Sequence, residues 1–195
     1  MSLDLNSGVS ASNRHRPFPR RSRAALVAVN PYADSRSDSR QRTEGALTPL
    51  RELGWSVTHG AADGLEHLAI GGAGAFAIES HAAAGPVRID GDQVTVTVPG
   101  MDCRSVPSDA WAYDARLRAA LANRLFHCEL SQRVPVAAVV VIWGEFAQRV
   151  VEGHHVTFVH GDEVTAWLQS RASRFSVGRV AELAAALRPD RHGCP

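Results

Sequence analysis

An acid-x-base pattern, Glu79-Ser80-His81, ends one of two apolar runs that are joined by a glycine-rich turn. Another acid, Glu66, lies near the start of the first run. Because side chains alternate along a strand, Glu79 and His81 are expected to share one face while Ser80 points the opposite way. Two carboxylates can hold a divalent cation, and an imidazole can accept a proton. These residue types together indicate a metal-dependent phosphodiesterase site.

The two apolar runs, Leu65–Ile70 and Ala75–Ile78, predict a β-hairpin because a short glycine-rich segment separates them. That segment, Gly71–Gly74, also resembles a phosphate-binding loop. The residues after it alternate as a strand and do not begin a helix, so a hairpin turn is the better interpretation.

Residues 64–81 resemble the core of the nuclease-related domain (NERD) family, which belongs to the PD-(D/E)XK nuclease-like group. In that family an acid and a histidine precede a strand, a glycine-containing turn follows, and an acid-x-lysine pattern ends the second strand. The resemblance continues through Gly85–Asp92, Val136–Trp143 and Val164–Leu168, and it covers most of residues 39–188. It implies an α/β fold with a restriction-endonuclease-like core.

The resemblance also implies roles for individual residues. Glu66, Glu79 and His81 would be catalytic. Glu66, Glu79 and the backbone carbonyl of Ser80 would hold a divalent metal ion, either Mg²⁺ or Mn²⁺, since hard cations prefer oxygen ligands. His67 follows the first acid and faces away from it, which leaves two roles open: catalysis, or packing and hydrogen bonding.

The chain departs from the family pattern at three places that bear on activity. His81 replaces the family's lysine, Glu66 replaces an aspartate, and Ser39-Arg40 stand where the family has Gly-Glu. All 21 basic residues are arginine, so no lysine from elsewhere in the chain can supply the missing charge. Arg88, on the next expected strand, is a candidate for that charge, although an exposed strand arginine is its ordinary interpretation.

Two functions therefore remain open. The first is a metal-dependent nuclease that hydrolyses the phosphodiesters of nucleic acid. The second is a catalytically degenerate NERD fold that serves as a binding or accessory module. Retention of both carboxylates favours the first function, whereas loss of the lysine and of the helix glutamate favours the second.

The formal net charge of +1 is unevenly distributed over the 195 residues. Residues 1–42 carry +5, while residues 43–195 carry −4. Sequence-independent binding to phosphates normally uses a basic face, so the body of the chain is not typical of a protein that coats DNA. Nucleic acid is nevertheless the partner that the motif indicates.

No signal sequence and no apolar run of about 18 residues is present, so we expect a cytoplasmic protein with no membrane partner. Cys103, Cys128 and Cys194 lack Cys-x-x-Cys spacing, which argues against a zinc finger or a disulfide framework. No pattern specifies an oligomeric state.

Residues 1–39 are polar and lack periodicity, so we expect a disordered arginine-rich tail followed by one NERD-like domain over residues 40–190. Apolar periodicity predicts helices at 42–53, 109–131, 162–170 and 178–187, and strands at 55–59, 65–70, 75–78, 87–89, 94–98, 136–143 and 156–159. This order predicts an α/β fold in which a mixed central sheet is flanked by helices.

Overall fold

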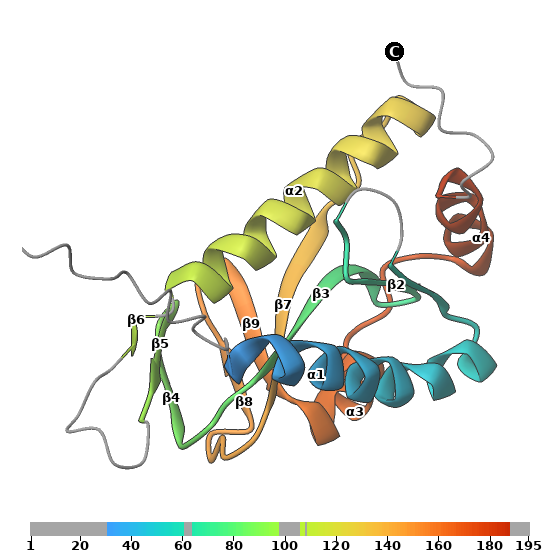
Figure 1. Ribbon diagram of the computed structural model, residues 1–195. Helices are drawn as coiled ribbons and strands as arrows, with labels where there is room; N and C mark the ends of the chain where they lie inside the picture. The colour runs from blue at the N-terminus through green and yellow to red at the C-terminus, as the bar shows by residue number, and fades with distance from the viewer. Residues whose placement is uncertain (1–30, 61–63, 98–105, 108, 188–195) are drawn as a thin grey trace, which may run out of the picture.

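The computed structural model describes residues 31–60, 64–97, 106–107 and 109–187 (Figure 1). The helices are α1 (Pro31–Leu47), the 3₁₀ helix η1 (Thr48–Leu53), α2 (Asp109–Leu130), the 3₁₀ helix η2 (Gly161–Glu163), α3 (Val164–Ser170) and α4 (Val177–Ala186). The strands are β1 (Ser56–His59), β2 (His67–Gly71), β3 (Gly74–Ala82), β4 (Val87–Asp90), β5 (Gln93–Val96), β6 (Val106–Pro107), β7 (Val136–Trp143), β8 (Val150–Glu152) and β9 (Val156–His160).

The central sheet has six strands in the order β1-β2-β3-β7-β9-β8. Strands β1, β2 and β3 pair antiparallel, β3, β7 and β9 pair parallel, and β8 returns antiparallel to β9. The predicted mixed α/β fold is therefore confirmed. The predicted hairpin is confirmed as well, with Gly71 opposite Gly74 at its turn.

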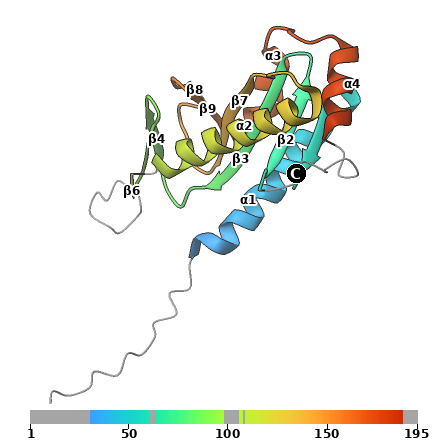
Figure 2. The ribbon, with the colours of Figure 1, turned by 90° about the horizontal axis from the view of Figure 1, so that it is seen from above.

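Helices cover both faces of this sheet (Figures 1 and 2). Helices α2 and α4 pack on one face, and α1 and α3 pack on the other. Strand β7 lies at the centre, and its continuous apolar sequence fits a strand that is covered on both sides. A parallel arrangement of β3, β7 and β9 requires such double cover, because crossover connections place helices on the faces.

Strands β4 and β5 were expected from the sequence, but they do not extend the central sheet. They form a separate three-stranded sheet with β6, and their apolar side chains face the core beneath α2. The amide side chain of Gln148 bonds both the N–H and the C=O of Ile89, which satisfies an edge of this small sheet.

The expectation of a disordered tail up to residue 39 is wrong at its C-terminal end. Helix α1 begins at Pro31, and Ser39 is fully buried. The buried contacts of α1 include polar ones. The hydroxyl of Thr43 donates a hydrogen bond to the carbonyl of Ser39 and accepts one from the indole N–H of Trp143. Apolar periodicity could not detect such contacts. Residues 1–30 of the expected tail lie outside the described residues.

Regular α-helix ends at Leu47, two residues before Pro49, so the helix expected over 42–53 is α-helical only in its first half. The chain continues from α1 as the 3₁₀ helix η1, which ends at Gly54 with positive φ. Within the described part of the chain, no helix combines the length and apolar character needed to span a bilayer.

Replacing Thr43 by valine tests how α1 is fixed to the sheet. The substitution keeps the shape but leaves the buried N–H of Trp143 without its acceptor, so we expect the free energy of unfolding to fall by about 1–3 kcal/mol. Urea unfolding measures this change. The matched control is Thr48→Val, whose hydroxyl hydrogen bond is exposed and whose effect should stay within about 0.5 kcal/mol. Equal effects of the two substitutions would contradict this account.

Candidate functional site

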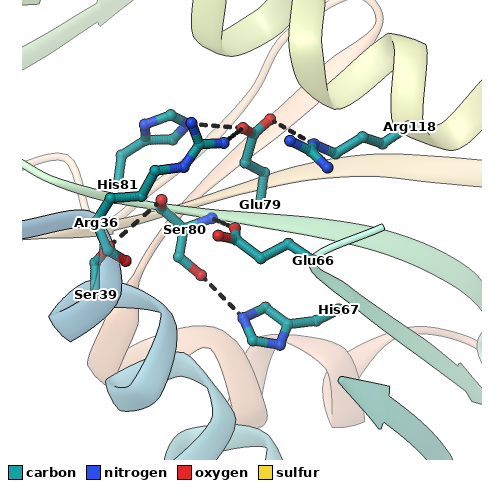
Figure 3. Close-up of polar contacts among 8 residues, drawn as sticks. All are labelled: Arg36, Ser39, Glu66, His67, Glu79, Ser80, His81 and Arg118. Carbon is teal, nitrogen blue, oxygen red and sulfur yellow. Dashed lines mark hydrogen bonds and ion pairs between the residues drawn. The ribbon is translucent and has the colours of Figure 1, made fainter. Parts of the chain in front are cut away.

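The motif acids lie in the β2–β3 hairpin and both are buried (Figure 3). Glu79 is in β3 with its side chain fully covered, and Glu66, directly before β2, is 7% exposed. The carboxylate of Glu66 accepts a hydrogen bond from the backbone N–H of Ser80 at 2.6 Å. The fold thus brings Glu66 against the strand that carries Glu79.

Burial raises the pKa of the Glu66 carboxyl above its ordinary value. The hydrogen bond from Ser80 acts in the opposite direction, because it stabilises the charged form. The negative charge of Glu79 raises the pKa further, which shows that the two carboxylates are electrostatic neighbours.

Three basic side chains from three elements surround the carboxylate of Glu79 (Figure 3). Arg36 of α1 reaches one oxygen with its Nη2 at 3.1 Å, and His81 of β3 lies 3.6 Å from the same oxygen. Arg118 of α2 approaches the other oxygen with its Nε at 3.5 Å. Glu79 is therefore a buried charge compensated from both helical layers.

His81 is held between a carboxylate and an aromatic ring. Its imidazole stacks on Trp111 of α2, with ring centroids 4.3 Å apart and planes 15° apart. As the sequence predicted, His81 and Glu79 share a face of β3, since the imidazole Nε2 faces the carboxylate. The side chain of His81 is only 13% exposed, so the stacking fixes it within the site.

Ser80 faces the opposite side of β3 and begins a buried chain of polar groups. Its hydroxyl lies 3.2 Å from Nε2 of His67, and Nδ1 of His67 lies 2.9 Å from Nδ1 of His59. The hydrogen-bonding role of His67 is thus the one that the structure shows. The carbonyl of Ser80 faces the hydroxyl of Ser39 at 3.5 Å, at the position where the resemblance placed the start of the first helix.

Burial lowers the pKa of His67 to about 3, and the neighbouring His59 and Arg40 act in the same direction. His67 is consequently neutral over the whole physiological range. A neutral imidazole has one N–H donor and one acceptor, which matches its two contacts, to Ser80 and to His59.

The expected metal ligands do not suit a divalent cation in this arrangement. Both oxygens of Glu79 face guanidinium groups, and a dication beside Arg36 and Arg118 would be repelled by two permanent positive charges. The described residues also contain no group of three or more His, Cys, Asp or Glu side chains placed to hold a metal ion. A metal site would require both arginines to move away.

Three polar atoms at this point are buried without a hydrogen-bond partner. They are Oε2 of Glu79, Nε2 of His81 and Nε of Arg118. Nε of Arg118 lies 3.5 Å from Oε2 of Glu79, and Nε2 of His81 lies 3.6 Å from the other oxygen of that carboxylate; both distances are longer than a good hydrogen bond. The cluster therefore has capacity to receive one more polar group, and buried groups of this kind normally have one.

The sequence did not reveal the residues that complete the site. Arg36 fell within the segment expected to be disordered, and Arg118 carried no signal that separates it from any other helix arginine. Arg88, the candidate named from the sequence, is exposed on β4 and makes no ion pair within the described part of the chain. The one sequence feature that pointed to the segment around Arg36 was Ser39, which matches the Gly position of the family's Gly-Glu pair.

Comparison of this chain with family models, with curated proteins and with solved structures finds no match. The proposal of a function therefore rests on the geometry of the Glu79 site.

The lowered pKa of His67 predicts a specific dependence of stability on pH. The unfolded chain takes up a proton near the ordinary pKa of 6.5, whereas the folded chain resists protonation down to about 3. The free energy of unfolding should thus fall as pH drops below 6.5, with a contribution of up to about 1.4 kcal/mol per pH unit. Urea unfolding between neutral and acidic pH measures this slope.

The variant His67→Gln removes the titrating group and should show a smaller loss of stability in acid. Glu66, whose raised pKa contributes the opposite sign, is present in both proteins, so the difference between them isolates His67. Identical slopes in the two proteins would contradict the buried neutral imidazole.

Proposed function

We propose that this chain is a catalytically degenerate, nuclease-related fold that binds the phosphate backbone of nucleic acid and does not hydrolyse it. The observation that carries the proposal is the enclosure of Glu79 by Arg36, Arg118 and His81. A nuclease needs this carboxylate for a metal ion. In this chain it balances two guanidinium groups instead.

Arginine suits phosphate because its planar group donates hydrogen bonds in a fixed fork. Arg36 and Arg118 bring two positive charges to the site, against the carboxylate of Glu79 and that of its neighbour Glu66, whose raised pKa favours its neutral form. Arg36 has a side chain that is 53% exposed, so it can turn toward a ligand from solvent without unfolding α1. Trp111 lies alongside, where its ring stacks on the imidazole of His81.

The negative net charge of residues 43–195 limits the affinity that we expect. An acidic body repels a polyanion at long range, so binding should depend on the local arginine pair and weaken steeply with salt. A module of this kind fits an accessory role better than sequence-independent coating of DNA.

Binding of a fluorescently labelled single-stranded oligonucleotide, followed by anisotropy, tests the proposal. We expect binding at about 50 mM salt that is largely lost at about 200 mM. Arg118→Gln should weaken it roughly tenfold, because it removes a charge-assisted contact to phosphate. The matched control is Arg124→Gln, an exposed arginine of the same helix that makes no contact with Glu79.

Arg36→Gln serves as a second variant, since loss of Arg118 beside a buried carboxylate also lowers stability. Weakened binding in both variants supports the proposal. If the wild type does not bind, or if Arg36→Gln and Arg118→Gln bind as Arg124→Gln does, the proposed site is wrong.

A metal-dependent nuclease is the second candidate, and one observation favours it. Glu66 bonds the backbone N–H of Ser80, the residue next to Glu79, and the charge of Glu79 raises the pKa of Glu66, as expected for two neighbouring carboxylates. With both arginines displaced, these oxygens would supply the ligands that Mg²⁺ or Mn²⁺ prefers.

Calorimetry with Mg²⁺ and Mn²⁺, together with a cleavage assay on nucleic acid, separates the two candidates. We expect no metal binding and no cleavage by the wild type, and a gain of metal affinity in the double variant Arg36→Gln/Arg118→Gln, because both oxygens of Glu79 are then released. Cleavage by the wild type that Glu79→Ala abolishes and His81→Lys preserves or raises would establish the nuclease instead.

A further inference from the structure

A groove lined in part by basic side chains lies beside α2, and none of its lining residues belongs to the Glu79 site. It has a volume of about 550 Å³ and runs between α2 and the first residues of β7 and β9, which α2 crosses (Figure 1). Its polar walls are formed by Arg116 and Asn123 of α2 and by His154 and His155 of the β8–β9 turn.

The polar side chains of this groove are free to bind a ligand. Arg116 and Asn123 make no side-chain hydrogen bond or ion pair with any described residue. His154 and His155 are exposed, and among the residues that the structure describes their rings contact only each other, with centroids 6.5 Å apart. An imidazole provides at least one N–H donor in either protonation state, so all four side chains present donors.

Among the described residues that line the groove none is acidic, but two acids lie close to the β8–β9 turn. Glu152, just before the turn, pairs with Arg171. Asp92 has no basic partner among the described residues; its carboxylate lies against Gly153 of the turn and faces the backbone N–H of His155 at 3.5 Å. Neither carboxylate forms an ion pair with Arg116 in the described part of the chain, in contrast to that of Glu79, which faces Arg118.

The floor of the groove is apolar and has no long side chains. It includes the exposed residues Ala120 and Ala137, which leave a flat surface between the helix and the sheet. Small-molecule sites typically have volumes of about 300–1,000 Å³ and combine an apolar surface with a few polar groups. The groove falls within this range of volumes, which is enough for a ligand the size of a mononucleotide, and it is open to solvent.

We infer that this groove binds an organic phosphate of nucleotide size. The phosphate would lie at Arg116 with support from His154 and His155, and the remainder of the ligand would cover the alanine floor. A ligand of this class supplies the acceptor oxygens that the four donors lack and the flat apolar group that the floor accommodates. This site goes beyond the proposed function and does not depend on it.

Proton NMR of the nine histidines during titration with adenosine monophosphate tests the inference at the site itself. His154→Gln and His155→Gln assign the two signals. We expect these signals to shift with a dissociation constant of about 0.1–1 mM. Arg116→Gln should raise that constant roughly tenfold, because it removes the charge-assisted contact, whereas the exposed control Arg124→Gln should leave it unchanged.

Three results would overturn the inference. The signals of His154 and His155 do not shift with up to about 10 mM ligand, well above the expected constant. Adenosine without phosphate shifts them as strongly as the nucleotide does. Arg118→Gln weakens the effect while Arg116→Gln does not, which would place the ligand at Glu79 and leave the binding reported there as evidence for the proposed function alone.

Discussion

The buried carboxylate of Glu79 is the constraint on which the arrangement of the site depends. An unpaired charge in the interior is strongly unfavourable, so Glu79 requires cations within ion-pair distance. Arg36 and Arg118 meet this requirement from opposite faces of the sheet, because α1 and α2 pack on different sides of β3. Glu79, in a central strand, thereby forms ion pairs with both helical layers.

The two faces of β3 have different surroundings between Glu79 and His81. Glu79 and His81 lie on the face that α2 covers, beside Arg118 and Trp111, and Arg36 reaches the same carboxylate from α1. Ser80 lies on the other face, where its hydroxyl contacts His67, which in turn contacts His59. These hydrogen-bond contacts hold β3 from the side opposite to Glu79 and His81.

Sequence patterns predicted those parts of the fold that rest on local apolar periodicity. Strand β7 and the β2–β3 hairpin were found because their apolar runs are continuous and bounded by proline or glycine. The start of α1 was missed because its buried contacts there involve Ser39, a polar residue. Arg36 and Arg118 could not be assigned to Glu79, because the packing that brings them to it involves segments far apart in the sequence. From the sequence alone, a single arginine on a helix is expected to be solvated.

The enclosure of Glu79 also constrains how this chain can change over generations. Loss of Glu79 alone would leave two guanidinium groups facing each other without their shared counter-charge, and loss of either arginine alone would leave part of a buried carboxylate uncompensated. Loss of Glu79 or of Arg118 alone is therefore costly, whereas the half-exposed Arg36 contributes less. Positions 79 and 118 should consequently vary together or not at all among descendants of this sequence.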